Sequence, residues 1–290
     1  MRNLHYSQKT AEEIKTIMTT IGGKMRNGKK NKNRTNFSAV KTHIESQFDN
    51  YSSCFVNNDL EHINPTLGLT DEQSATVSYL YESGQEETSA LWKELVKENG
   101  NKTIICPICG HGFARELDHY VPREKYCEFS LHLWNLIPLC HDCNHKKDAI
   151  WLDNNGNRII FNAYLDNPAT NDFWKVDVDL KNGFPYVTVD IDCNKVLTEG
   201  DKIEFRTIEA LKLCTFYEDC VNSNLRDTIY EIQQDRITYP ECTHENLWNE
   251  RKKKVNGYLR NSSSLKTEKM LEYKALLTTE FNSWILKKKI

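Results

Sequence analysis

Residues 106–148 read CPICGHGFARELDHYVPREKYCEFSLHLWNLIPLCHDCNHKKD, and this stretch constrains the fold more than any other. A CxxC pair stands near each end, Cys106 with Cys109 and Cys140 with Cys143. Each CxxC turn delivers two sulfurs on one side of the chain, and two such pairs suit one tetrahedral Zn²⁺. Four ordinary buried thiols are the alternative, but they require no paired spacing. We therefore predict a structural zinc that ties the two ends of a small module together.

The residues between the two pairs carry chemistry that a plain zinc finger does not need. Asp118 offers a hard oxygen ligand, His119 offers a base that titrates near neutral pH, and Arg123 offers a fixed cation. Successive residues of a strand point to opposite faces, so Asp118 and His119 serve one site only where their strand ends. Pro122 favours such an end shortly after the histidine. The pattern indicates a metal-dependent hydrolytic site.

Residues 104–150 resemble the HNH (ββα-metal) endonuclease family, in its zinc-stapled branch. The likeness is carried by CPIC at 106–109, DHYVP at 118–122, Asn135, and CHDCNHK at 140–146. For the fold, the resemblance implies two short strands followed by one helix, at residues 116–119, 136–139 and 141–150.

The resemblance also implies a role for each site residue. His119 would be the general base, and Asn135 would brace the loop that carries this histidine. Asp118 and Asn144 would hold a catalytic cation. Many members of the family have histidine where Asn144 stands. An amide oxygen favours Mg²⁺ or Mn²⁺ over softer ions, so we expect one of these two cations in addition to the structural Zn²⁺.

Phosphodiester hydrolysis needs the same set of groups. An activated water attacks phosphorus in line, and a cation beside the scissile phosphate neutralises the charge that builds on its oxygens. A positioned histidine that accepts the proton of this water contributes about 10² to 10⁴ in rate. Flanking phosphates need further cations, since arginine binds them as a fork and lysine as a point charge. We predict such contacts at Arg123, Lys125, Lys146 and Lys147.

Some of these residues also admit a plainer interpretation. A histidine such as His119 is often a core residue that a carbonyl satisfies, and Asn135 has the residue type of a turn. His141 and His145 are four residues apart, on one face of the predicted helix, and are therefore rival metal ligands. Of the two, His145 is favoured, because a shift of one residue in the helix start would present it in place of Asn144.

Composition bounds the function of the chain. Its 290 residues are 39% hydrophobic and carry a formal net charge of −3, with a sequence pI of about 6.3. Such a chain buries a full core, and it lacks the overall positive charge of a protein that binds DNA indiscriminately. Attraction to phosphate must be local or supplied by a partner. Basic runs at 24–34, 251–254 and 287–289 are each either a solvated face or a binding arm, and the first is the best candidate for a nucleic-acid arm.

We predict an α+β chain in three parts. Apolar residues at helical spacing indicate a helical scaffold over residues 1–100, with the basic arm at 24–34, and the zinc-stapled nuclease module occupies 101–150. Residues 151–290 form a β-hairpin, turning at Asn182-Gly183, and then a helical bundle. Acidic residues at two-residue spacing are typical of solvent-facing strand positions, so we do not expect a second metal site at Asp177, Asp179, Asp190 and Asp192.

The location of the chain is predicted from what the sequence lacks. Six further cysteines show no paired spacing, as expected for reduced thiols: Cys54, Cys127, Cys193, Cys214, Cys220 and Cys242. No signal peptide is recognisable, and no apolar run approaches the ~20 residues of a membrane span. We expect a cytoplasmic protein without a membrane partner.

The stretch 117–147, a following strand at 161–164 and the helical flanks are similar to the HNH subunits of bacterial anti-phage systems of the Septu and retron-associated type. That resemblance implies a cleaving subunit that acts with an ATPase partner, on DNA in preference to RNA. The leading hypothesis is therefore a metal-dependent endonuclease. One alternative is a catalytically silent zinc-ribbon module that binds nucleic acid or protein. Another is a metal enzyme for a different substrate that uses His141 and His145.

Overall fold

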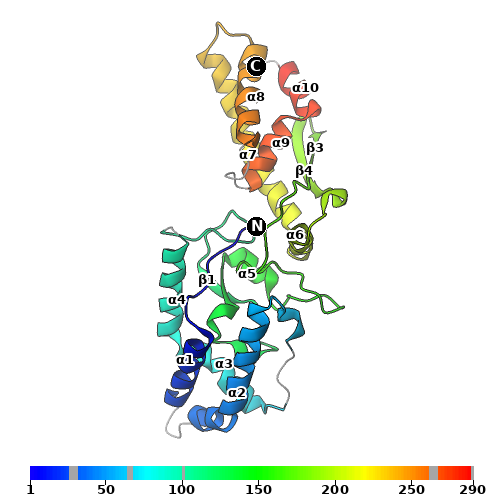
Figure 1. Cartoon of the computed structure of the whole chain (residues 1–290). Helices are drawn as coiled ribbons and strands as arrows, with labels where there is room; N and C mark the ends of the chain where they lie inside the picture. The colour runs from blue at the N-terminus through cyan, green and yellow to red at the C-terminus, as the bar shows by residue number, and fades with distance from the viewer. Residues whose placement is uncertain (26–31, 64–67, 100–101, 261–266, 289–290) are drawn as a thin grey trace. The chain divides into compact units, whose positions relative to one another are not determined.

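The computed structural model describes residues 1–25, 32–63, 68–99, 102–260 and 267–288 (Figure 1). The chain divides into two compact units. Unit 1 comprises Met1–Ile108 and Gly112–Pro168, and unit 2 comprises Cys109–His111 and Ala169–Ile290. Unit 1 thus combines the predicted N-terminal scaffold with most of the module between the cysteine pairs.

Unit 1 is built from helices followed by a two-stranded sheet and a short helix. Its elements are α1 (Ala11–Lys24), α2 (Lys32–Val56), η2 (Leu60–His62), α3 (Asp71–Ser83), α4 (Gln85–Glu98), β1 (Glu116–His119), η3 (Cys127–Phe129), η4 (Leu133–Asn135), β2 (Leu136–Leu139) and α5 (His141–Lys147). A capping box at Thr70 fixes the start of α3. Thr70 accepts a hydrogen bond from the backbone N–H of Gln73, whose side chain accepts one from the backbone of Thr70.

The core of unit 1 lies where α2 packs on the segment between β1 and β2. The Tyr51 and His132 rings lie 4.2 Å apart, and Phe55 stacks on Trp134 with 4.9 Å between centroids. These four side chains are almost completely buried. In Figure 1 the blue α2 and the cyan α3 lie beside the green segment that holds β1 and α5. The N-terminal helices therefore pack directly against the loop that follows β1.

β1 and β2 form an antiparallel pair at the residues predicted for the two strands. Glu116 lies opposite Leu139, and His119 lies opposite Leu136. The helix that follows is shorter than the predicted 141–150, because Asp148 adopts a positive φ of 44° and ends α5 at Lys147.

Unit 2 contains the predicted hairpin and helices. Its elements are β3 (Trp174–Lys181), β4 (Phe184–Ile191), η5 (Cys193–Lys195), α6 (Glu199–Ala210), α7 (Leu213–Thr238), α8 (His244–Arg260), α9 (Thr267–Leu276) and α10 (Thr279–Lys287). Asn182 and Gly183 both have positive φ, as a two-residue hairpin turn requires. The apolar spacing over residues 268–286 by itself predicts one helix. It is instead two helices, because Thr278 caps the start of α10.

Other predictions outside the module have mixed outcomes. Asp177, Asp179 and Asp190 are exposed on the hairpin, as expected for strand positions that face solvent. The strand predicted at 161–164 is wrong: these residues form a turn, in which the Asp166 carboxylate accepts the backbone N–H of Asn162. The middle of the basic arm, residues 26–31, lies outside the described residues.

The fold class is α+β, as predicted, with two small antiparallel sheets in the described parts of the chain. No helix within those parts is long and apolar enough to cross a membrane.

Burial of His132 makes the stability of the fold depend on pH. Its ring is inaccessible to solvent and contacts the Ser52 hydroxyl, and burial lowers its pKa to about 3. The folded state therefore keeps His132 neutral, whereas the unfolded chain binds a proton below about pH 6.5. Stability is fully present above that pH and falls as pH decreases, by up to about 1.4 kcal/mol per pH unit for one group.

We expect His132→Gln to reduce the pH dependence of the free energy of unfolding, because glutamine keeps a polar group near Ser52 but does not titrate. Urea unfolding between about pH 7 and pH 4.5 measures this slope. His43→Gln, at an exposed position of α2, is the control and should keep the parental slope. A parental slope in His132→Gln would contradict the assignment.

Candidate metal centre and adjoining cavity

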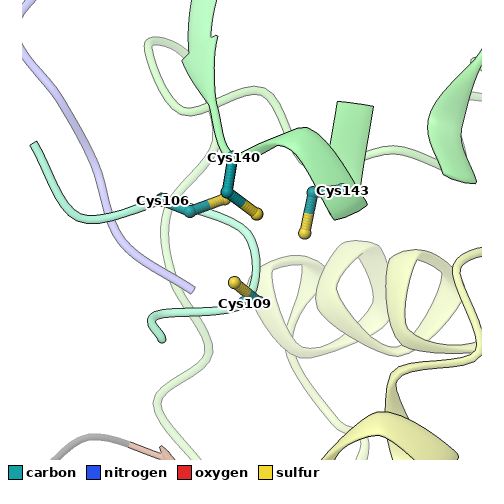
Figure 2. Close-up of side chains that lie close together, drawn as sticks. All are labelled: Cys106, Cys109, Cys140 and Cys143. Carbon is teal, nitrogen blue, oxygen red and sulfur yellow. The ribbon is translucent and has the colours of Figure 1, made fainter. Parts of the chain in front are cut away.

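Four cysteine side chains converge at the two ends of the module. The sulfurs of Cys106, Cys109, Cys140 and Cys143 all lie within 4.8 Å of one another, and all four residues are buried. Figure 2 shows the sulfurs directed toward a common centre, with Cys143 on the first turn of α5. Zinc–sulfur bonds of ~2.3 Å in a tetrahedron place sulfurs about 3.8 Å apart. The cluster is therefore compatible with one structural zinc ion, as the sequence predicts.

The backbone of the first CxxC turn is shaped for this cluster. The backbone N–H of Cys106 donates to the Gly112 carbonyl at 2.7 Å, which closes the turn, and Gly110 has a φ of +66°. A Cβ at Gly112 would lie 3.0 Å from Cβ and 3.3 Å from Sγ of Cys140. Glycine at 112 thus leaves room for the sulfur of the second pair. A donor set of four buried thiols fits Zn²⁺ better than it fits a harder ion.

Removal of one sulfur should release the zinc and unfold the module. Structural zinc binds finger-like peptides with about 10–16 kcal/mol, which a small module cannot replace by packing. We expect Cys140→Ser to lose bound zinc in elemental analysis and to lower the melting temperature. Cys242→Ser, at an exposed position of unit 2, should retain both. A Cys140→Ser protein with a full equivalent of zinc would exclude this centre.

A cavity of about 340 Å³ lies beside β1 and α5 in unit 1. Several residues that the sequence predicts for the catalytic site line it: Asp118, His119, Arg123, Asn144 and His145. Tyr81 of α3 also lines the cavity. The structure thus brings the proposed base and the proposed oxygen ligands to one place.

His119 is held with a defined proton position. Nε2 lies 2.9 Å from the Ser130 carbonyl oxygen, which can only accept, so Nε2 carries the hydrogen and Nδ1 is the basic nitrogen of the neutral ring. The Ser130 hydroxyl in turn donates to the Val77 carbonyl on α3. Burial lowers the pKa of His119 to about 4, and the Tyr81 ring packs edge-on at 4.8 Å. The imidazole is therefore neutral near pH 7.

Asp118 forms a buried ion pair with Lys147. Nζ of Lys147 lies 2.8 Å from Oδ2 of Asp118 and donates to the His119 carbonyl at 2.8 Å. Burial raises the pKa of Asp118, and the ammonium opposes that shift. Lys147 is only 1% exposed. Its ammonium therefore stabilises the end of β1 from inside the module, away from the surface position predicted for a phosphate contact.

Asn144 is held by a residue that the sequence analysis missed. Its Nδ2 donates to Oε2 of Glu116 at 2.6 Å, and Oε1 of Glu116 lies 2.9 Å from Nδ1 of His141. The hydrogen bonds from Asn144 and then from His141 lower the pKa of Glu116. Strand alternation was the available signal, because Glu116 stands two residues before Asp118 and therefore on the same face of β1.

Asn135 is completely buried and connects the two ends of the loop after β1. Its amide nitrogen donates to the carbonyls of Val121 and Phe129, at 3.0 and 3.2 Å. Its oxygen accepts the Val121 backbone N–H at 2.8 Å and the Tyr51 hydroxyl at 3.1 Å. These contacts are what a residue that braces the loop requires. The turn interpretation is compatible with them, since Asn135 ends η4.

We expect Asn135→Ala to destabilise unit 1 strongly, because each buried group left without a partner costs about 1–3 kcal/mol. The groups that lose their partner are the Val121 backbone N–H and carbonyl, the Phe129 carbonyl and the Tyr51 hydroxyl. Differential scanning calorimetry measures the drop in melting temperature. Asn154→Ala, at an exposed loop position, should melt as the parent does. Equal melting of the two variants would remove the bracing role.

The remaining predicted cations and the rival histidines lie nearer the surface. Arg123 pairs with Glu82 at 3.0 Å and sits over the Tyr81 ring, whereas Lys125 and Lys146 are exposed. The exposed His145 stacks on His141, with ring centroids 6.2 Å apart. Tyr81 and Glu82 had no signal in the sequence, because only tertiary packing brings α3 to this cavity.

The cavity has the donor chemistry for a hard cation. The carboxylates among its lining residues are Glu116, Asp118, Glu124 and Asp148, and Arg123 is the arginine beside them. Carboxylate and amide oxygens are ligands that Mg²⁺ and Mn²⁺ prefer. Three or more histidine, cysteine or acidic side chains with ligand atoms within 4.8 Å of one another could hold a metal ion. Among the described residues only the four cysteines meet this criterion, and the side chains that line the cavity do not.

Part of this chain resembles a phage protein. An alignment of 84 residues is 34% identical to protein ea31 of Escherichia phage lambda. It covers 27% of this chain and 27% of the phage protein, so the chain matches about a quarter of that relative's length. No family model and no solved structure matches the chain. The resemblance to HNH endonucleases therefore stays a prediction.

Proposed function

We propose that this protein is a metal-dependent endonuclease of the HNH type that hydrolyses phosphodiester bonds of nucleic acid. The observation that carries the proposal is the state of His119. Its ring is neutral, its Nε2–H is fixed on the Ser130 carbonyl, and it shares a cavity with Asp118 and Asn144. A buried histidine of purely structural use has no need of hard oxygen donors around the same cavity.

In the proposed reaction, His119 accepts the proton of a water molecule at Nδ1. The Ser130 carbonyl holds Nε2–H throughout, so the base keeps one tautomer and one orientation. The activated water attacks phosphorus in line, and the leaving oxygen departs on the opposite side. Arg123, which lines the cavity, would bind a phosphate oxygen.

Asp118 and Asn144 would hold the catalytic Mg²⁺ or Mn²⁺. When bound, such an ion neutralises the charge that develops on the phosphate oxygens and the leaving group. Lys147 fixes the buried carboxylate of Asp118 relative to the end of β1, and a cation would have to bind beside this ammonium. The zinc centre would hold α5, which carries Asn144, against the strands.

The biological setting is also part of the proposal. DNA is the favoured polymer, and the net charge of −3 suggests that a partner assists targeting. By the resemblance given above, that partner is an ATPase of a bacterial anti-phage system, and the chain acts in the cytoplasm.

A catalytically silent zinc module that binds nucleic acid or protein is the second candidate. One observation favours it: the proposed ligands are engaged with protein groups, Asp118 with Lys147 and Asn144 with Glu116. Such a module would bind its partner but would not cleave nucleic acid, whichever divalent cation is supplied.

Cleavage of plasmid DNA with Mg²⁺ or Mn²⁺ tests the proposal directly, with and without the co-purifying partner. We expect His119→Ala to lower the cleavage rate by about 10²–10⁴, the usual contribution of a general base. His43→Ala, at an exposed position of α2, should cleave at the parental rate.

The possible results separate the candidates. Equal rates for His119→Ala and the parent would remove the base assignment. Binding of nucleic acid without cleavage, across single-stranded and double-stranded DNA and RNA, would favour the silent module.

A further inference from the structure

We propose that Glu116 is a positioning residue that turns the amide oxygen of Asn144 toward the catalytic cation. The inference rests on the proposed function, because it concerns the same cation site. It adds a residue that the sequence analysis did not assign, and it gives that residue a role distinct from that of a ligand.

The strand register places Glu116 beside the start of α5. Glu116 pairs with Leu139, and Cys140 then caps the helix. A side chain at Glu116 therefore reaches the first turn of α5, where it contacts His141 and Asn144. β1 continues to Asp118 on the same face, so the carboxylates of Glu116 and Asp118 both line the cavity.

The chemistry of the contact fixes which way the amide points. A carboxylate offers only acceptors, whereas a primary amide has a donating nitrogen on one side and an accepting oxygen on the other. Because Oε2 of Glu116 lies 2.6 Å from the amide of Asn144, the nitrogen must face the carboxylate. Oδ1 of Asn144 is then turned away from Glu116. That oxygen is the only atom of the side chain that binds a hard cation.

Glu116 is itself held from a second direction. Its other oxygen, Oε1, lies 2.9 Å from Nδ1 of His141. Both carboxylate oxygens are thus engaged with α5, which suits a group that orients a ligand. A direct ligand would instead direct an oxygen to the ion. His141 accordingly acts as a support for Glu116, although the sequence made it a rival metal ligand.

Two substitutions distinguish orientation from direct ligation. Glu116→Gln keeps an oxygen that accepts from Nδ2 of Asn144 but loses the negative charge. Glu116→Ala loses both. If Glu116 orients Asn144, the glutamine variant should retain cation affinity and the alanine variant should not.

The measurement is Mn²⁺ binding to the full-length, zinc-loaded protein, followed by the electron paramagnetic resonance signal of free Mn²⁺. We expect Glu116→Ala to weaken binding about 10–100-fold, as loss of a group that orients a ligand usually does. Glu116→Gln should bind nearly as the parent does. In an Asn144→Ala background, Glu116→Ala should cause no further loss, because no amide is left to orient. Zinc content and circular dichroism verify that each variant is folded.

Asp142→Ala is the control, because it removes an exposed carboxylate from the first turn of α5 that does not line the cavity. A loss in this variant equal to that in Glu116→Ala would mean a general effect of charge and would overturn the inference. An equal loss in Glu116→Gln and Glu116→Ala would also overturn it, since charge on Glu116 would then be required.

Cleavage assays of the same proteins separate this inference from the proposed function. If the parent cleaves DNA and binds Mn²⁺, and Glu116→Ala binds Mn²⁺ equally well, only the role of Glu116 is refuted. A parent that neither cleaves nor binds Mn²⁺ would refute both.

Discussion

Convergence of four thiols at the two ends of one short module is the constraint on which the proposed site depends. Cys140 follows β2 directly and is the N-cap residue of α5, and Cys143 lies in the first turn of that helix. Whatever fixes these sulfurs therefore also fixes the direction of α5 relative to β2. Asn144 follows Cys143 directly, so the position of its amide is inherited from the cluster. A module of this size has too small a core of its own to fix a helix to such accuracy.

The cavity beside this module combines charged groups of very different accessibility. Lys147 is buried against Asp118. Glu116 is partly exposed, and its carboxylate contacts the Asn144 amide and the His141 ring of α5. Burial shifts the pKa values of Asp118 and His119, adjacent residues of β1, in opposite directions. It disfavours the charged form of each, which is the anion for aspartate and the cation for histidine. It raises the pKa of Asp118 and lowers that of His119. Lys147 offsets the first effect, and the second keeps the imidazole of His119 in its neutral form near pH 7.

Side chains and backbone groups of α2 and α3 contact the residues of the proposed site directly. The Val77 carbonyl on α3 holds Ser130, and the Ser130 carbonyl holds His119. Tyr81, one turn further along the same helix, covers the imidazole and underlies Arg123. α2 adds the hydroxyl of Tyr51 to the contacts of Asn135. The orientation of the His119 ring thus depends on residues of α2 and α3, which act through the loop between β1 and β2.

The likeness to HNH endonucleases predicted both strands of the module, whereas spacing along the chain was sufficient to predict the convergence of the paired cysteines and the hairpin turn at Asn182-Gly183. Each of the latter two is a local pattern, in which the residue types themselves impose the geometry. The roles of His119, Asp118 and Asn144 came from the likeness to HNH endonucleases, and they stay predictions. Residue type alone did not reveal that Lys147 is buried, that Glu116 holds Asn144, or that Tyr81 borders the cavity. Those facts arise from packing between segments far apart in the chain, where burial and a partner's position decide whether a lysine meets solvent or a carboxylate.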